Sequence, residues 1–388
     1  MKRFEQAEVM GKLPEQFFAK LVKKVSYYME QGYDVINLGQ GNPDQPTPLH
    51  IVDALKEGAD DPNFHKYSPF RGHSFLKQAA SDFYEREYGV TLNPEKEIAI
   101  LFGGKVGLVE LSQCYLNAGD IALVPDPGYP DYWSGIAMAG AKMETMPLKE
   151  ENQFLPRYAD LEESILNEAK LMFLNYPNNP TAGVATREFF IETVELARKH
   201  DILVCHDFAY GAIGFDGQKP VSFLEVDGAK DVGIEIYTLS KTYNMAGWRV
   251  GFAVGNEHVI EAINLLQDHF YVSLFGAVQH AAAAALNGPQ VCVENLVYTY
   301  EKRRNAFIGR LKQHGWDVEA PKGSFFCWLP VPEGYTSESF ADYVLDKAHV
   351  VVAPGIGFGK AGDKYVRVGL LTSEERLIEA ADRIAKLM

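Results

Sequence analysis

Short apolar runs and longer amphipathic stretches alternate between about residues 95 and 255 of the chain. The short runs have the length and composition of buried strands, whereas the longer stretches place apolar residues at helical spacing. This alternation predicts an α/β fold with a mostly parallel, seven-stranded sheet sandwiched by helices. The expected strands are 98–103, 121–126, 142–148, 171–177, 202–207, 235–240 and 249–255, and the expected helices include 105–118, 129–140 and 187–200.

The pattern changes after about residue 290. A long helical stretch, 291–315, leads to strand candidates and then to a closing helix from Thr372, which predicts a smaller α+β domain. The strand candidates are 325–330, 350–354 and 365–371. Because the N-terminal segment precedes the alternating region and has its own strand candidate, we expect it to pack with the smaller domain. The expected division is 1–45 for this segment, 46–285 for a large domain and 286–388 for the C-terminal domain.

The composition narrows the classes of function. A chain of 388 residues can form two domains and enclose a cleft. The formal net charge of −15 disfavours nucleic acid and anionic membranes as partners, because the mean field repels both. With no apolar run of transmembrane length and no secretory signal pattern, we expect a cytoplasmic protein. The four cysteines lie far apart, which favours reduced thiols over a metal site or disulfides.

Polar side chains follow several of the expected strands. Gly104 and Lys105 come after the first strand, and Asn179, Asp207 and Lys241 come at or after later ones. In open α/β folds, ligands bind beyond the carboxyl ends of the strands. We therefore expect these residues to meet at one site.

The segment 238–251, TLSKTYNMAGWRVG, is the strongest chemical signal. Most lysines are solvated surface residues, and Lys241 could be one. It stands, however, at a strand end among hydroxyl groups, with Arg249 eight residues on. Burial and a cationic neighbour both lower the pKa of a lysine, which suits an amine that attacks an aldehyde. Thr238, Ser240 and Arg249 could hold a dianionic phosphate beside it.

Four other segments have a functional and a plain structural interpretation. Glycines before the helical stretch at Lys105 can bind phosphate through free N–H groups, or they can form a turn needed for packing. Asp207 can serve a cofactor or cap a helix. Asn179 lies in NYPNNPTAG, which reads equally as a connecting loop, and Tyr129 reads equally as a core tyrosine.

Taken together, these motifs resemble the fold-type I pyridoxal-phosphate aminotransferases of class I/II. Segment 238–251 is similar to the cofactor-lysine signature of that family, and the resemblance extends from VINLGQGNPD at 35–44 to the C-terminal helix. It implies an enzyme that uses pyridoxal 5′-phosphate to move an amino group between an L-amino acid and a 2-keto acid. By resemblance, Lys241 is the catalytic residue, which carries the cofactor and acts as general base and acid.

The resemblance also implies roles for the other residues. Asp207 would keep the pyridine nitrogen protonated, so that the ring remains an electron sink. Tyr210 and Asn179 would bind the phenolic oxygen of the ring, on which Tyr129 would stack. The residues implied at the cofactor phosphate are Gly104, Lys105, Thr238, Ser240, Arg249 and, from the neighbouring subunit of a homodimer, Tyr67. The residues implied at the substrate are Gly39, Asn179 and Arg367, whose guanidinium suits a carboxylate.

The substrate side chain is expected to be uncharged. Family members that act on dicarboxylates commonly use a second arginine from the segment that resembles 265–276, but this chain has Phe270, Tyr271 and Phe275 there and no arginine. An arginine from elsewhere, such as Arg71, would change that expectation.

Within the family, the chain is similar to bacillar aminotransferases of methionine salvage, which act on 2-keto-4-methylthiobutyrate. Its GGK segment, 103–105, is also similar to that of diaminopimelate aminotransferases. A broad or aspartate/diaminopimelate-type aminotransferase and a C–S lyase on the same fold therefore stay open. The sequence does not identify the amino donor, for which glutamine and aromatic amino acids are candidates by resemblance alone.

Two rival classes are disfavoured. Gly357, Gly359 and Gly362 spell G-x-G-x-x-G, but the next segment reads as a strand, whereas a dinucleotide site requires a helix there. A transcription regulator built on this fold would need an added DNA-binding module, for which the chain has no spare N-terminal domain. Such a degenerate relative would also be expected to lose Lys241, which is present.

Overall fold

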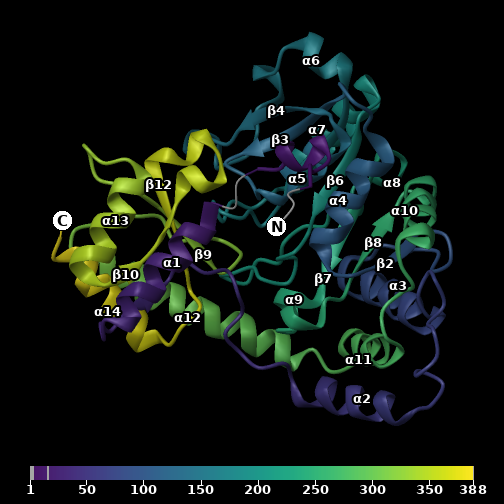
Figure 1. Cartoon of the computed structure of the whole chain (residues 1–388), viewed down its shortest axis with the longest axis horizontal. Helices are drawn as coiled ribbons and strands as arrows, with labels where there is room; N and C mark the ends of the chain where they lie inside the picture. The colour runs from purple at the N-terminus through teal and green to yellow at the C-terminus, as the bar shows by residue number, and fades with distance from the viewer. Residues whose placement is uncertain (1–3, 15–16, 388) are drawn as a thin grey trace.

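The computed structural model describes residues 4–14 and 17–387 (Figure 1). Within them, seven strands form one sheet in the order β2-β8-β7-β6-β5-β3-β4, which confirms the predicted α/β class. Only β8 runs against the other strands of this sheet, in the part of the chain described, because a short connection joins it to β7. The strands are β2 Ile98–Leu101, β3 Ile121–Asp126, β4 Lys142–Pro147, β5 Ala169–Asn175, β6 Leu203–Asp207, β7 Gly233–Thr238 and β8 Gly251–Gly255.

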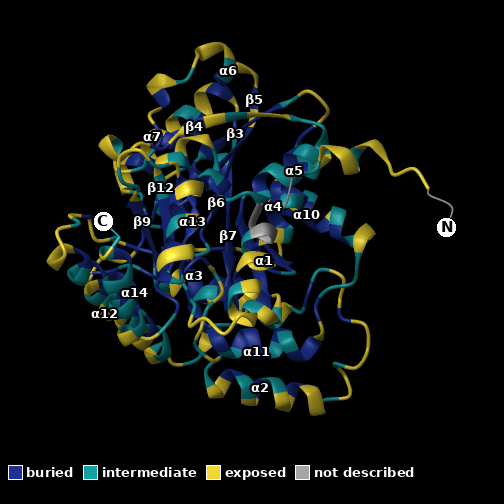
Figure 2. Ribbon diagram, turned by 60° about the vertical axis from the view of Figure 1, so that its left-hand side comes forward, coloured by how far each residue is buried: buried dark blue, intermediate teal, exposed yellow. Residues whose placement is uncertain are grey.

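Helices cover both faces of this sheet, and its central strands are buried (Figure 2). Strands in such a position are apolar on both faces, so alternate residues of each strand enter two different cores. One core contains α4 Gly104–Tyr115, α5 Asp131–Ala139 and α10 Glu257–Phe270. The other contains α2 Leu49–Asp60, α3 Ser74–Tyr88, α7 Arg187–His200 and α11 Gly276–Asn287. Short helices α6 Glu163–Glu168, α8 Ala229–Val232 and α9 Leu239–Thr242 complete the connections.

A smaller α+β part follows, as the change of pattern predicted. It has an antiparallel sheet of order β11-β12-β9, and β1 Ile36–Asn37 pairs in parallel with β10. The expected strand 350–354 is divided at Val352, because β10 pairs with β1 whereas β11 pairs with β12. The elements are α12 Val291–Gln313, β9 Phe326–Pro330, α13 Ser337–Ala348, β10 Val350–Val351, β11 Ala353–Pro354, β12 Tyr365–Gly369 and α14 Glu374–Ala385.

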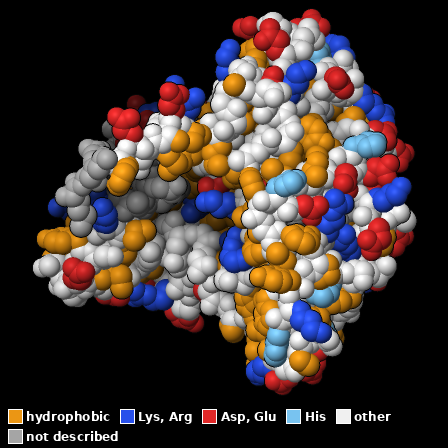
Figure 3. Space-filling view, turned by 45° about the vertical axis from the view of Figure 1, so that its right-hand side comes forward, with side chains coloured by type: hydrophobic (Ala, Val, Ile, Leu, Met, Phe, Trp, Pro, Cys, Tyr) orange, Lys and Arg blue, Asp and Glu red, His pale blue; other side chains and the backbone are white. Residues whose placement is uncertain are grey.

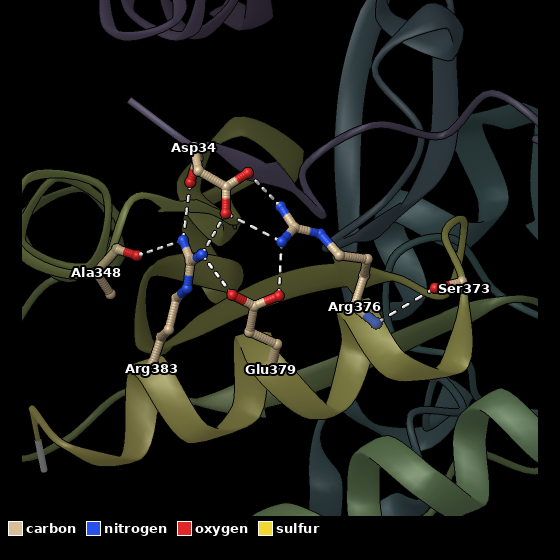
Figure 4. A network of polar contacts seen from close by, with 6 residues as sticks. All are labelled: Asp34, Ala348, Ser373, Arg376, Glu379 and Arg383. Atoms are coloured by element: carbon tan, nitrogen blue, oxygen red, sulfur yellow. Dashed lines mark hydrogen bonds and ion pairs between the residues drawn. The ribbon is translucent and has the colours of Figure 1, made fainter. Parts of the chain in front are cut away.

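Both ends of the chain meet in this smaller part. The N-terminal helix α1, Phe17–Glu30, packs through Val25 on Leu345 of α13 and Val351 of β10. Ahead of β1, Asp34 accepts hydrogen bonds from Arg376 and Arg383 of α14 (Figure 4). The hydrogen bonds from Arg376 and then Arg383 lower the pKa of Asp34 to about 2. Exposed ion pairs stabilise little, so this network mainly defines where β1 begins.

The glycine-rich segment before β12 forms two short 3-10 helices, Gly355–Phe358 and Lys360–Lys364, and the strand predicted after it is confirmed. Gly359 has a φ of 132°, and a Cβ on it would lie 2.1 Å from Asp126 Oδ1. Close approach to the end of β3 therefore requires glycine at this position.

Among the helices of the described ranges, none combines the length and the apolar character needed to cross a membrane.

A buried ion pair connects the segment after β1 to α12. Arg303 donates to both carboxylate oxygens of Asp44, at 2.9 Å and 2.8 Å, and to the Leu370 carbonyl oxygen at 3.1 Å. Its side chain is only 8% exposed. Three residues after Asp44, the Thr47 hydroxyl donates to the carbonyl oxygen of Asn244, which lies in the connection between β7 and β8, at 2.7 Å. The segment that crosses between the two parts is thus fixed at both ends.

We expect Arg303→Met to destabilise the protein, because it leaves the Asp44 carboxylate half-buried without its partner. Removing one member of such a pair costs about 3 kcal/mol, which for this chain lowers the melting temperature by about 4 °C. Thermal denaturation of the cofactor-free protein by circular dichroism measures the shift. The control is Lys302→Met, on the same helix as Arg303. It removes an exposed ion pair with Glu374 of α14 and should change the melting temperature by less than about 1 °C. Equal decreases in melting temperature in both variants would contradict a stabilising role for the ion pair between Arg303 and Asp44.

Candidate active site

A cavity of about 470 Å³ lies beyond the carboxyl ends of the central strands, bounded on its other side by the smaller part. A space-filling view shows the hollow between the two parts, with Lys and Arg side chains at its edge (Figure 3). The wall includes every residue expected at the cofactor and at the substrate carboxylate except Tyr67. Those residues are Gly39, Gly104, Lys105, Tyr129, Asn179, Asp207, Tyr210, Thr238, Ser240, Lys241, Arg249 and Arg367.

Lys241 lies in α9, directly after β7. Its Nζ donates to the Gly41 carbonyl oxygen at 2.9 Å and lies 5.6 Å from the centre of the Phe325 ring. Burial, followed by the charges of Arg367 and Arg249, lowers the pKa of Lys241 to about 8, although Asp207 opposes the shift. Far more of this amine is therefore neutral and nucleophilic near neutral pH than is the case for an exposed lysine.

The N-terminus of α4 faces Arg249. Gly103 precedes the helix with a φ of 81°, and a Cβ there would lie 2.5 Å from Arg249 Nη2, so glycine is required for this approach. Thr238 lies beside the first helical residue, because a Cβ on Gly104 would come 3.8 Å from its Cβ. The Thr238 hydroxyl donates to the Ser240 hydroxyl at 2.8 Å. Helix N–H groups, two hydroxyls and a guanidinium form a donor set that suits a phosphate.

Asp207 ends β6 and is 6% exposed. Its Oδ2 accepts a hydrogen bond from the Tyr132 hydroxyl at 2.9 Å. Burial raises the pKa of Asp207 to about 6, against the effects of the Tyr132 hydrogen bond and of neighbouring His206. Asn175, opposite Asp207 on β5, donates to the Asp207 carbonyl oxygen at 2.7 Å. A cationic ring nitrogen placed beside this carboxylate would be stabilised by it.

Arg367 reaches the cavity from β12. It donates to the Asn179 side-chain oxygen at 2.8 Å and to the Gly39 carbonyl oxygen at 3.0 Å. Its guanidinium carbon lies 4.1 Å from the centre of the Phe326 ring and 4.7 Å from that of Phe358. Burial lowers the pKa of Arg367 to about 10, which Tyr210 and Tyr129 oppose. The guanidinium is held in one orientation, as recognition of a planar carboxylate requires.

Two tyrosines and an ion pair complete the wall. Burial raises the pKa of Tyr210, which packs edge-on against Phe325, with 5.2 Å between ring centres. Burial and then Asp131 raise the pKa of Tyr129, so both phenols are neutral donors at physiological pH. Lys105 Nζ pairs with the Asp131 carboxylate at 2.9 Å, and Asp131 begins α5.

The remaining residues expected from the sequence lie outside the wall of this cavity. Tyr67 is 91% exposed, and Phe270 and Phe275 are exposed as well. Tyr271 donates its hydroxyl to the Glu110 carboxylate. Arg71 donates to Glu261 and Asp268 and is not among the described residues that line the cavity.

Some wall residues gave no functional signal in the sequence. Asn175 lies inside a strand-like run, where the sequence cannot distinguish an asparagine that belongs to a binding site from one that only supports the fold. Gly41 was part of the resembling segment, but its carbonyl contact with Lys241 depends on the fold. The apolar side of the cavity comes from α1, whose amphipathic pattern predicts only a packed helix. The residues that α1 contributes are Leu21, Val22, Val25 and Ser26.

Comparison with known proteins decides the family. The sequence model described as aminotransferase class I and II matches residues 33–384. The chain belongs to the class I and II aminotransferases. It is 66% identical to the L-glutamine--4-(methylsulfanyl)-2-oxobutanoate aminotransferase of Bacillus subtilis, over 99% of this chain and 97% of that protein. It is 45% identical to the LL-diaminopimelate aminotransferase of Moorella thermoacetica, over 99% of this chain and 98% of the relative.

The solved structures agree with this assignment. The substrate-bound structure of BacF from Bacillus subtilis superposes with a TM-score of 0.95 and 52% identity, covering 100% of this chain and 98% of that one. A structure of an aminotransferase from Staphylococcus aureus has a TM-score of 0.92 and 39% identity, covering 98% of this chain and 99% of that one. The enzyme is therefore an aminotransferase, and membership of this family implies pyridoxal phosphate as the cofactor.

The pKa of Lys241 gives a direct test of the site in the cofactor-free protein. Because an amine reacts only when neutral, we expect labelling of Lys241 by trace acetic anhydride to reach half its maximum near pH 8. An ordinary lysine does so near pH ~10.4. Peptide mass spectrometry between about pH 6 and pH 11 measures the profile, with exposed Lys142 as the internal reference. A midpoint for Lys241 above about pH 10 would show that the amine is an ordinary one.

Proposed function

We propose that the enzyme transfers an amino group from L-glutamine to 4-(methylsulfanyl)-2-oxobutanoate, also called 2-keto-4-methylthiobutyrate, and so forms methionine in methionine salvage. The name of the relative that is 66% identical supports this reaction. Pyridoxal 5′-phosphate is the cofactor, as in the rest of the family.

The distribution of charge on the cavity wall carries the substrate assignment. Among the described lining residues, the cations are Lys105, Lys241, Arg249 and Arg367. Lys105 is paired with Asp131, and Arg249 faces the helix N-terminus, which leaves Arg367 for the α-carboxylate of the substrate. The wall formed by α1 is apolar except for Ser26. A methylthioethyl side chain can be buried there, whereas a second carboxylate would lose its hydration without gaining a partner.

The residues divide the work as follows. Gly104, Thr238, Ser240 and Arg249 hold the cofactor phosphate, while Asp207, Asn179 and Tyr210 hold the ring, with Tyr129 on its face. The bound cofactor supplies an electron sink for the α-carbon of the amino acid. Lys241 would anchor the cofactor, and its free Nζ would take the proton from the α-carbon of the substrate and deliver it to the aldehyde carbon of the cofactor. Arg367 and Gly39 orient the substrate carboxylate for this step.

The enzyme works as a homodimer in this proposal, in which Tyr67 serves the site of a second subunit. Tyr67 and nearby Phe70 are exposed. They are next to Phe275, since the Ser68 hydroxyl donates to the Leu274 carbonyl oxygen at 2.7 Å. Hydrophobic side chains form a band along the larger part beside the hollow (Figure 3). An apolar surface of this kind is typical of a protein interface.

The division of the chain and its location belong to the same proposal. Residues 46–285 form the cofactor-binding domain, and 286–388 together with 1–45 form the smaller one, which the pairing of β1 with β10 supports. Residues 1–3, 15, 16 and 388 of these limits lie outside the described residues. The enzyme acts in the cytoplasm, where its four free cysteines stay reduced.

We expect 4-(methylsulfanyl)-2-oxobutanoate to have a kcat/KM about a hundredfold above those of oxaloacetate and 2-oxoglutarate, because the unpaired distal carboxylate costs a few kcal/mol. A panel of keto acids with L-glutamine as donor measures these values. Product formation should require a stoichiometric acceptor, which a C–S lyase would not need. If oxaloacetate or the keto acid precursor of LL-diaminopimelate is the best acceptor, the substrate assignment is wrong although the family stands.

The shared site predicts complementation between two inactive variants. Tyr67→Ala and Lys241→Ala homodimers should each be strongly impaired. After mixing under dissociating conditions, a heterodimer has one site with an intact Lys241 and an intact Tyr67 from its partner. Random pairing then restores about a quarter of the wild-type activity, because half the dimers are mixed and each has one complete site. Activity no higher than the sum of the separate variants would exclude a shared site.

A further inference from the structure

Tyr132 contacts a residue of the cavity wall from the side that faces away from the cavity. It lies in α5 and is 0% exposed, and it does not line the cavity. Its hydroxyl donates to Asp207 Oδ2 at 2.9 Å. Its ring is stacked on Phe173, with 4.8 Å between ring centres and 11° between planes, and meets Tyr129 edge-on at 5.8 Å. The phenol can therefore neither swing away from the carboxylate nor exchange its partner for water.

We propose that Tyr132 is a positioning residue that holds the Asp207 carboxylate ionised and turned toward the ring nitrogen of the cofactor. The inference rests on the proposed contact between Asp207 and the cofactor. An ionised carboxylate has no proton to donate, so the phenol of Tyr132 is the donor in this hydrogen bond. A hydrogen bond donated to the carboxylate favours its charged form over the protonated one. It also removes one rotational freedom from the carboxylate before the cofactor arrives.

The surroundings of Asp207 show why such a donor is needed. Burial raises its pKa to about 6, close to physiological pH, and among the groups that oppose burial the Tyr132 hydrogen bond has the largest effect. His206 and Lys241 lower the pKa less, as does the backbone N–H of Ala209. The other titratable groups that interact with Asp207 are Cys205, Tyr129 and Tyr210, which are neutral in this pH range. Without Tyr132, the carboxyl group would hold its proton at higher pH.

The test is Tyr132→Phe, which keeps the ring and removes only the hydroxyl. The readout is the dissociation constant of pyridoxal phosphate for the cofactor-free protein, measured by fluorescence titration at several pH values. We expect the ratio of variant to wild-type constants to be about tenfold at pH 7 and to fall toward one above pH 8.5. The ratio exceeds one at lower pH because more of the variant has a protonated Asp207, which must lose its proton before it can pair with the ring. Ionisations of the cofactor and of Lys241 are common to both proteins and cancel in the ratio.

Kinetics of the loaded enzyme provide a second readout. Because Tyr132 does not touch the substrate, the variant should lose about tenfold in kcat while KM for the keto acid changes less than about twofold. The acid limb of its pH profile should move to higher pH. A role in packing alone would leave the pH dependence of cofactor binding unchanged.

Tyr158→Phe is the matched control. Tyr158 is also buried and stacked on a phenylalanine, Phe189, and its hydroxyl bonds to the neutral Thr193 hydroxyl at 2.7 Å, away from the site. The ratio should stay near one at every pH for this control, while both variants melt within a few degrees of the wild type. A ratio for Tyr132→Phe that is independent of pH, or equal to that of Tyr158→Phe, would overturn the inference.

Asp207→Asn separates failure of this inference from failure of the proposed function. It should weaken cofactor binding strongly, and adding Tyr132→Phe to it should cause no further pH-dependent loss. If Asp207→Asn leaves cofactor binding and turnover near normal, the proposed contact with the ring is wrong. If Asp207→Asn is severe and Tyr132→Phe is silent, the contact stands and the role of Tyr132 is refuted.

Discussion

The site depends on the register between two parallel strands. Asn175 of β5 and Asp207 of β6 are paired residues, so that their side chains leave the sheet at the same edge. From there a chain of hydrogen bonds crosses the cavity: Asn175 accepts from the Asn179 N–H at 2.8 Å, and Asn179 accepts from Arg367 at 2.8 Å. A one-residue slip would turn Asp207 into the core and break every later link.

The same alternation places a second polar group on the opposite side of the strand. His206, next to Asp207, points into the core and bonds to the Glu235 carboxylate of β7 at 2.7 Å, with both side chains 0% exposed. Glu235 also accepts from Tyr84 at 2.8 Å and from Ser222 at 2.7 Å, so its charge is fully hydrogen-bonded. Buried charges are tolerated only when satisfied in this way. Through the ring of His206, which contacts the Tyr176 backbone, this network supports the loop that carries Asn179.

The sequence was sufficient for the large sheet, because periods of two and of about 3.6 residues are local properties of the chain. It also located residues such as Asp207 and Lys241, since strand ends in this kind of fold converge. It could not assign Tyr132, whose pattern is that of any core tyrosine, nor the wall formed by α1, which depends on how the two parts meet. Val352 was misread for a similar reason: five apolar residues read as one strand, although their partners belong to two sheets.

The cavity wall carries positively charged side chains although the chain as a whole is negatively charged. In a chain with a net charge of −15, Arg249 and Arg367 are directed into one cavity, where their fields reach Lys241. Both fields lower the pKa of Lys241, so they favour the neutral form of its amine, which is the nucleophilic form. An anion on either guanidinium cancels part of that field. In the proposed function, a substrate carboxylate bound by Arg367 would therefore raise the basicity of Lys241 at the stage when the amine takes a proton. Burial still keeps its pKa below that of an exposed lysine, so that the proton can be given up again.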